Sequence, residues 1–247
     1  IKESGKKDLA LIFSEAPARA AAVFTTNKIQ SASILVSKNH LAQGPVQAIV
    51  INSGNANTCT GEQGLSHAVQ MAQITADLLK ILPQNVLVAS TGIIGVALPM
   101  EKVKQGITEA VKVLARGGSQ EAAQAIMTTD TFFKETAIQF EVGGQIVKIG
   151  GIAKGSGMIA PNMATMLAFL TTDAHIEQIC LRDCLRKSVN KSFNMITVDG
   201  QPSTNDMVAI LANGMAGNNE IVLGRESASV FGTALDFVCQ ELAKMIV

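Results

Sequence analysis

The sequence contains neither tryptophan nor tyrosine, and its nine phenylalanines are its only aromatic residues. Proteins that bind single-stranded nucleic acid stack the bases on aromatic side chains, so this scarcity argues against that class. The chain also has no excess of one charge, because twenty Lys and Arg residues balance twenty Asp and Glu residues. We therefore expect neither a nucleic acid nor an anionic membrane as a partner.

Cysteine and histidine are scarce as well, with four and three copies in 247 residues. Cys180 and Cys184 are four residues apart, a spacing at which two core thiols fall on one helix face. No second pair has zinc-finger spacing, so no metal site is expected. Sparse thiols without a disulfide framework indicate a reducing compartment, the cytoplasm. The three histidines lie near no reactive-looking motif, which argues against a Ser-His-Asp triad.

Several segments and motifs are missing. No apolar run reaches the roughly 18 residues that a membrane helix needs, and no signal peptide is visible. There is no P-loop, no H-E-x-x-H and no G-x-S-x-G. The chain begins at Ile1 rather than at methionine, and its last predicted helix reaches Val247 without a stop signal. We therefore expect the natural protein to extend beyond these residues.

The chain is long and apolar enough, at 47% hydrophobic residues, to bury a substantial core. Strand and helix patterns alternate along it, which predicts an α/β or layered α+β domain. Strands are expected at residues 46–51, 86–90, 136–142, 146–149 and 166–170, with a hairpin turn at Gly143-Gly144. Helices are expected at residues 66–82, 99–117, 176–191 and 228–245.

The most unusual stretch is residues 153–169, AKGSGMIAPNMATMLAF, in which Thr165 stands where a loop enters an apolar strand. A threonine at such a place is most often a simple strand former. The chemical alternative is a nucleophile. If the bond between Ala164 and Thr165 is cut, the new α-amine, with a pKa of about 7.7–8.0, is a base beside the hydroxyl. The hydroxyl itself can make that cut by attacking the Ala164 carbonyl.

Several further positions carry weaker signals. Thr91 and Gly92 follow a buried strand and can offer a hydroxyl and a backbone N–H to an oxyanion, although an ordinary turn explains them as simply. Thr128, in the TTDT string at residues 128–131 after a short helix, is by itself better explained as part of a cap or turn. Lys154 is most often a solvated charge, and residues 199–206 are most often a polar loop.

Taken together, these stretches resemble the ornithine acetyltransferase family, also called glutamate N-acetyltransferases. The matching strings are DLALI at residues 8–12, VFTTN at 23–27, NSGNAN at 52–57, STGIIG at 90–95, MTTDT at 127–131, KGSGM at 154–158, PNMATM at 161–166, TVDG at 197–200 and STND at 203–206. They follow the family's order and span essentially the whole chain.

The resemblance implies an α/β fold, a layered sandwich of mixed sheets between helices, as in ornithine acetyltransferases and DmpA-like enzymes. It implies self-cleavage between Ala164 and Thr165. Residues 1–164 are then the α-chain portion, and residues 165–247 are the N-terminal portion of a β chain. The implied assembly is a heterotetramer of two α and two β chains.

The resemblance also implies the reaction and its residues. Thr165 is the implied nucleophile, which takes acetyl from N2-acetylornithine and passes it to glutamate in arginine biosynthesis. Thr91 and Gly92 are the implied oxyanion hole. Thr128 and Lys154 belong to the implied amino-acid site, where the neighbouring Thr129 ranks lower. No bound cofactor is implied, and acetyl-CoA is allowed as a co-substrate.

The sequence departs from the family in one respect. Family members continue past Val247 with a segment that carries a substrate-binding Glu, and later an Asn and a Thr.

Two other classes stay open. An N-terminal-nucleophile aminopeptidase or amidase of similar architecture would use the same Thr165 but pass the acyl group to water. A binding module without enzymatic activity would give Thr165 no special role, and the bond between Ala164 and Thr165 would stay whole.

Overall fold

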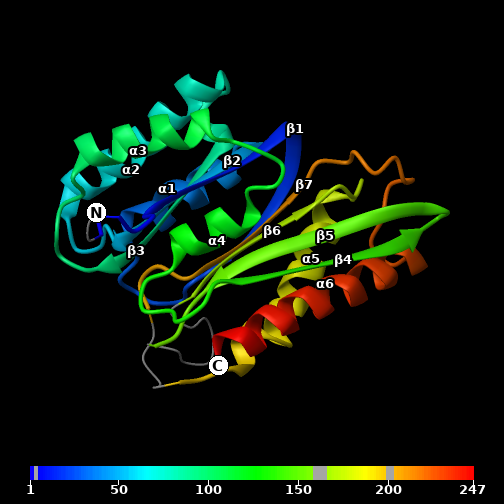
Figure 1. Cartoon of the computed structure of the whole chain (residues 1–247). Helices are drawn as coiled ribbons and strands as arrows, with labels where there is room; N and C mark the ends of the chain where they lie inside the picture. The colour runs from blue at the N-terminus through cyan, green and yellow to red at the C-terminus, as the bar shows by residue number, and fades with distance from the viewer. Residues whose placement is uncertain (3–4, 158–165, 199–202) are drawn as a thin grey trace.

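The computed structural model describes residues 1–2, 5–157, 166–198 and 203–247. Within these ranges the strands form one mixed sheet in the order β3-β2-β1-β7-β6-β5-β4 (Figure 1). The strands are β1 (Leu9–Phe24), β2 (Val46–Asn55), β3 (Val86–Ile93), β4 (Lys134–Val142), β5 (Gln145–Lys154), β6 (Leu167–Thr172) and β7 (Met207–Ala212). The helices are α1 (Ala32–Leu41), α2 (Gly61–Leu79), α3 (Met100–Lys112), α4 (Ser119–Ile126), α5 (Gln178–Asn190) and α6 (Glu226–Ile246).

Strand β1 folds this sheet into two layers. Its first part pairs with β2 from Leu9 to Phe13, its second part pairs with β7 from Arg19 to Phe24, and the register is irregular between Phe13 and Ala18. Pro17 lies in this irregular stretch, where its missing N–H breaks no ladder. Figure 1 shows β1, in blue, bending over at this point, so that the β3-β2 part of the sheet lies above the β7-β6-β5-β4 part.

The side chains of the strands alternate between two cores, as the two-residue period of a strand requires. In β2, Ala48 and Val50 pack against α2 and α3, whereas Ile49 and Ile51 join a core between the two parts of the sheet. Strand β7 alternates in the same way, with Ala209 in the central core and its neighbours facing α5 and α6. Two β-layers with helices outside them are the layered sandwich that the family resemblance implied, so that expectation is confirmed.

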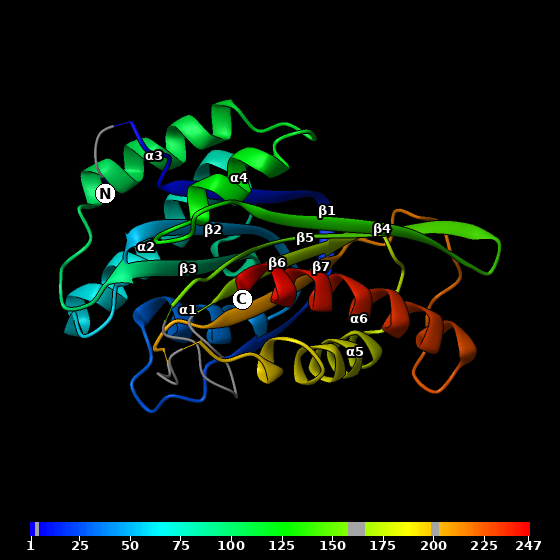
Figure 2. The ribbon, with the colours of Figure 1, turned by 60° about the horizontal axis from the view of Figure 1, so that its bottom comes forward.

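The helices complete the layers. In Figure 2, α5 and α6 lie along the outer face of the β7-β6-β5-β4 part, and α2 and α3 lie with the β3-β2 part. Helix α4 contributes Ala123, Ala125 and Ile126 to the central core, so it fills the space between the two parts of the sheet. Within the described ranges, no helix has the length and apolar character that crossing a membrane requires.

Most predicted elements are present, with shifted ends. The predicted helix at residues 99–117 ends earlier, at Lys112, and the one at 66–82 begins earlier, at Gly61. Three elements were not predicted: β1, α1 and β7. Strand β1 contains Pro17, and a proline inside an apolar run is typical of an edge strand or of a segment that is not a strand. The apolar residues of α1 do not gather on one face, so its sequence carries little helical periodicity.

The fold brings two rows of strand ends to one end of the sandwich. In one row, Leu9 pairs with Asn52, and Asn52 pairs with Ser90 of β3. In the other, Lys154 pairs with Leu167, and Leu167 pairs with Met207. The side chain of Asn205, just before Met207, donates to the Ser90 carbonyl at 2.8 Å and so joins the two rows.

Candidate active site

Four segments that are distant in sequence meet where these rows end. Lys154, at the end of β5, donates from Nζ to Thr91 Oγ1 at 3.2 Å, which links it to the end of β3. Met166, just before β6, donates its N–H to Asp206 Oδ1 at 3.2 Å, just before β7. The predicted nucleophile Thr165 and the predicted cleavage residue Ala164 lie outside the described residues. The residue that follows Thr165 in sequence is nevertheless fixed at this point.

Lys154 is buried, with 3% of its side chain exposed, and is therefore not the solvated surface charge that a lone lysine usually is. Burial lowers the pKa of Lys154 to about 8, while the carboxylates of Asp130 and Asp206 act in the opposite direction. The ammonium is still the main form at neutral pH. A compact charge in a dry site exerts a much stronger field than one in water.

Thr91 and Gly92, the residues predicted to form the oxyanion hole, lie side by side near the end of β3. Thr91 is buried and its hydroxyl oxygen accepts from Lys154. A hydroxyl has one donor hydrogen besides its lone pairs, so Thr91 can still donate to a ligand. Gly92 is exposed, and a Cβ built on it would lie 2.3 Å from the carbonyl carbon of Gly54 in β2. Only glycine fits there without displacing the backbone of β2.

Asp130 organises the loop on the other side of Lys154. Its Oδ2 accepts from the Thr128 N–H at 3.0 Å, and its Oδ1 accepts from the Gly155 N–H at 2.7 Å. The same Oδ1 forms a buried ion pair with Lys134 Nζ at 2.6 Å. Burial alone would raise the pKa of Asp130, but the Gly155 N–H and the Lys134 ammonium outweigh it, and the pKa is lowered. Asp130 is thus an anion that ties the Thr128 turn to Gly155.

The two threonines of this turn border the segment that carries Lys154. Thr128 is half-buried and is held through its backbone by Asp130. Thr129 is exposed, and its hydroxyl is hydrogen-bonded to the Ser156 hydroxyl at 2.8 Å. The predicted site residues Thr91, Gly92, Thr128 and Lys154 are therefore brought together by the fold.

Asp206 is a member of this group that the sequence reasoning missed. It is 1% exposed, and its Oδ1 accepts from the Met166 N–H. Burial raises the pKa of Asp206 to about 8, although hydrogen bonds from the Ser203 side chain and the Met166 N–H act against this. The available signal was the string STND at residues 203–206, which the local pattern alone presents as a polar loop.

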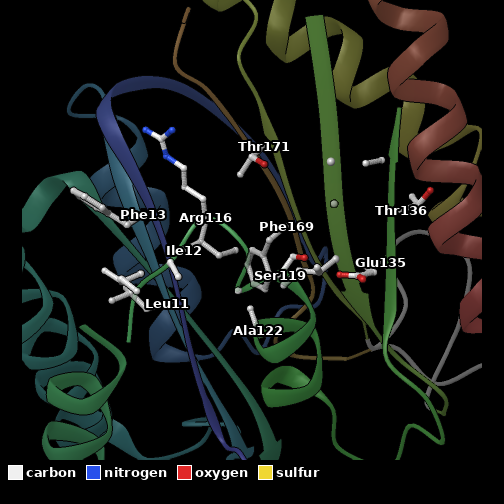
Figure 3. Close-up of a pocket in the computed structure, with 17 residues that line it drawn as sticks. Leu11, Ile12, Phe13, Arg116, Ser119, Ala122, Glu135, Thr136, Phe169 and Thr171 are labelled. Atoms are coloured by element: carbon white, nitrogen blue, oxygen red, sulfur yellow. The ribbon is translucent and has the colours of Figure 1, made fainter. Parts of the chain in front are cut away.

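A cavity of about 540 Å³ lies elsewhere, between α4 and the strands β4 and β5 (Figure 3). Its lining includes Arg116, Glu135, Phe169 and Thr171, and none of the described site residues named above. The convergent polar groups, and not this cavity, mark the candidate site.

Comparison with known proteins places these observations in a family. The model of the ArgJ family matches residues 1–247. The arginine biosynthesis bifunctional protein ArgJ of Symbiobacterium thermophilum is 53% identical over 243 residues, which is 98% of this chain and 60% of that protein. The chain thus spans about 60% of the length of the curated relatives that it matches.

Two solved structures of similar sequence agree with this family assignment. The Bacillus halodurans arginine biosynthesis bifunctional protein argJ is 44% identical, with a TM-score of 0.61, over 66% of this chain and 85% of that chain. The Mycobacterium tuberculosis ornithine acetyltransferase, crystallised with ornithine, is 36% identical, with a TM-score of 0.56, over 65% and 86%.

A more distant structure shares the fold alone. The L-aminopeptidase D-Ala-esterase/amidase of Ochrobactrum anthropi, a variant of the Ntn hydrolase fold, is 13% identical and matches 99% of this chain and 79% of that chain with a TM-score of 0.57.

Proposed function

The chain belongs to the ArgJ family, and from this we propose that it carries the acetyl-transfer site of an arginine biosynthesis enzyme. Acetyl moves from N2-acetylornithine to glutamate through an acetyl ester on Thr165. The observation that carries the proposal is the contact between Lys154 Nζ and Thr91 Oγ1, which lies where β6 begins just after Thr165.

The chemistry follows from the groups that converge there. After cleavage between Ala164 and Thr165, the α-amine of Thr165 takes the hydroxyl proton while the oxygen attacks the acetyl carbonyl. The Thr91 hydroxyl and the Gly92 N–H stabilise the oxyanion, and Lys154 polarises that hydroxyl. The C–N bond breaks, ornithine leaves with the proton, and the glutamate amine then attacks the ester by the same route in reverse.

Lys154 and Thr128 also border the place where the amino-acid part of the substrate binds. Both substrates carry an α-carboxylate, for which a buried ammonium is a compact partner. The ornithine in the Mycobacterium tuberculosis structure is the same class of molecule. We further propose acetyl-CoA as a co-substrate, a heterotetramer of two α and two β chains, and a cytoplasmic location.

Chain lengths support the cleavage. The matches to the two solved relatives cover 66% and 65% of this chain, which corresponds to about 163 and 161 residues. This is close to the 164 residues that precede Thr165. The Ochrobactrum anthropi match, by contrast, covers 99% of the chain.

The cleavage is tested by intact mass under denaturing conditions. We expect two pieces, the second of which begins Thr-Met-Leu-Ala-Phe by N-terminal sequencing. Thr165→Ala should remain one piece, because it lacks the attacking hydroxyl. The matched control is Thr171→Ala, an exposed threonine of β6, which should split like the parent. A Thr165→Ala protein that still splits at this bond would exclude Thr165 as the cleaving group.

Transfer is distinguished from hydrolysis by incubating the cleaved protein with N2-acetylornithine, with and without glutamate. An acetyltransferase forms N-acetylglutamate, and ornithine release depends on glutamate. An amidase of the same fold releases acetate and ornithine equally in both samples, and that result would overturn the proposed acceptor.

A further inference from the structure

Asn205, just before β7, makes side-chain hydrogen bonds to the ends of two other strands near the candidate site. Its Nδ2 donates to the Ala56 carbonyl, just after β2, at 2.6 Å and to the Ser90 carbonyl in β3 at 2.8 Å. Its Oδ1 accepts from the Thr58 hydroxyl at 2.8 Å. Asn205 is 6% exposed, so these hydrogen bonds form out of contact with bulk water.

The orientation of the Asn205 amide is fixed by these partners. A backbone carbonyl can only accept a hydrogen bond, so the carbonyls of Ala56 and Ser90 require the NH2 group on their side. The side-chain oxygen then faces the Thr58 hydroxyl. Both donor hydrogens and the oxygen are used, and no other side chain of this length offers two donors on one atom and an acceptor beside it.

These contacts close the sandwich at the end where the candidate site lies. The bend of β1 between Phe13 and Ala18 joins the two parts of the sheet at the opposite end. Asn205 belongs with β7 to the part that carries β6, whereas Ala56 and Ser90 belong to the part that carries β2 and β3. The Asn205 amide therefore fixes how far apart the two parts of the sheet stand at the site.

Asn205 also connects the residue after the proposed nucleophile with the residue before the proposed oxyanion hole. Its chain neighbour Asp206 accepts from the Met166 N–H at 3.2 Å, which holds the start of β6. Its side chain holds the Ser90 carbonyl, which shares a planar peptide group with the Thr91 N–H. A shift of Asn205 thus changes the position of both strand ends relative to each other.

We propose that Asn205 is a positioning residue for acetyl transfer, whose side-chain amide holds the oxyanion donors of Thr91 and Gly92 in place relative to the start of β6. The inference rests on the proposed function. Asn205 acts through the Ser90 carbonyl and not on the substrate itself. A displacement of about 1 Å between reacting groups can cost about 10²-fold in rate, so the position of these donors matters.

The first test compares kcat with KM. Asn205→Leu keeps the branched shape of the side chain but removes both donors. We expect kcat for acetyl transfer to fall by about 10–100-fold. The KM for N2-acetylornithine should change little, because oxyanion donors act on charge that develops in the transition state. An unchanged kcat, or a raised KM at the parent's kcat, contradicts the proposal.

Asn218 provides the matched control for this variant. It is 4% exposed, and its Nδ2 donates to the backbone carbonyls of His175 and Asn219 at 3.0 and 2.7 Å. These residues lie past the far end of β6, away from the candidate site. Asn218→Leu should lower the stability as Asn205→Leu does, but it should leave kcat at the parent's value. Equal kcat losses in the two variants mean that a general loss of stability explains both, and the proposal fails.

A double-mutant cycle tests whether Asn205 acts through the oxyanion donors. In a Thr91→Ala background, one of the donors that Asn205 positions is already missing. Asn205→Leu should therefore lower kcat several-fold less in this background than in the parent. Losses of log kcat that simply add show that the two residues act independently, which overturns the proposal.

Hydrogen exchange tests the physical part of the proposal without an acetyl-transfer assay. The Ala56 N–H donates to the Ile93 carbonyl at 2.8 Å, and the Gly95 N–H donates to the Thr58 carbonyl at 2.9 Å. Both bonds join the segments after β2 and β3 that Asn205 holds. If the Asn205 amide keeps these segments in place, the two amides exchange slowly because of it.

The measurement is made in the uncut Thr165→Ala protein, so that differences in cleavage do not enter. Asn205→Leu should speed exchange of these two amides by about tenfold or more relative to the Val88 N–H in the middle of β3. Asn218→Leu should not. Unchanged exchange in Asn205→Leu overturns the proposal. If the parent transfers no acetyl, the proposed function fails, and the exchange rates still decide whether Asn205 holds these segments.

Asn205→Ser covers the case in which the leucine variant does not fold. A serine hydroxyl has one donor hydrogen on a shorter side chain, so it cannot satisfy both carbonyls, and the space it leaves is polar enough for water. The loss of kcat and the faster exchange are expected in this variant too. Parent-like kcat and exchange in Asn205→Ser show that the amide positions nothing, and the proposal is then wrong.

Discussion

At the residue scale, Gly92 shows how closely the end of β3, where the candidate oxyanion hole lies, packs against the end of β2. Its φ of +135° lies in a region that favours glycine, and a Cβ would overlap backbone atoms of Gly54 and Asn55. Backbone atoms of a paired strand cannot move aside alone. Gly92→Ala should therefore lower the free energy of unfolding by roughly 3 kcal/mol and separate the ends of β2 and β3. Urea denaturation measures the loss.

Gly95 supplies the matched control three residues away. It also has a positive φ, of +81°, but a Cβ there meets no atom within 4 Å. Gly95→Ala should cost only the conformational strain, about 1–2 kcal/mol. Equal losses for the two variants would show that the contact with Gly54 is not what requires glycine at position 92.

Local patterns could find some residues of this site but not others. The local pattern alone favours an ordinary turn at Thr91 and Gly92 and a solvated charge at Lys154, and the resemblance of their strings to the family makes them candidates. Asp206 was missed because its place in this group depends on burial and on a hydrogen bond with Met166, which is 40 residues away in sequence. The pKa and the hydrogen bonds of a carboxyl group depend on its burial and on partners that are distant in sequence, and a local sequence pattern contains neither.

At the element scale, helix α6 lies close to β5 because Gly151 has no side chain. A Cβ on Gly151 would lie 2.9 Å from Leu170 Cδ2 and 3.0 Å from Leu242 Cδ1, and both leucines are fully buried. Valine adds two further methyl groups to this contact. Gly151→Val should therefore push α6 outward and lower the free energy of unfolding by roughly 1–3 kcal/mol.

The preceding residue is a matched control for that variant. A Cβ on Gly150 has its nearest neighbour at 3.7 Å, on Ala137 of β4. Gly150→Val should change the stability by no more than about 0.5 kcal/mol, or increase it, because valine favours strands. Denaturant midpoints of the two variants are compared. If both valines cost the same, strand conformation and not the contact with α6 explains the loss.

The elements that sequence reasoning found are those with a strong period or a clear turn, such as the β4-β5 hairpin at Gly143-Gly144. Strand β1 was missed because one continuous strand serves both layers and contains Pro17 at its bend. Helix α1 was missed because it packs on more than one side: Ile34 faces the central core, and Val36 faces an outer one. An element that is buried on several sides loses the periodic pattern by which sequences reveal helices.

At the scale of the whole molecule, the two predicted portions of the chain are interleaved. Strands β6 and β7 follow residue 165 and lie between β1 and β5, which precede it. Each side of this insertion has a ladder of six residue pairs. After cleavage the pieces should therefore stay together, with one native mass near 25.9 kDa per pair and two masses in denaturant.

Native mass spectrometry or size exclusion measures this on the cleaved protein. The uncut Thr165→Ala variant is the control, and it should give the same native mass per αβ unit. Pieces that separate without denaturant would contradict the ladders that join β1 to β7 and β5 to β6.

The bent strand β1 has a consequence for the order in which the protein is made. Arg19 to Phe24 leave the ribosome early, yet they pair with residues 207–212, which are synthesised far later. The N–H of Met166 likewise gains its hydrogen-bond partner only after Asp206 has been synthesised. Translation proceeds in one direction, so this end of the sandwich cannot assemble on a nascent chain that stops before β7. The segment that follows the predicted cleavage bond thus gains its contacts at Met166 only after β7, the strand that pairs with both β1 and β6, has been synthesised.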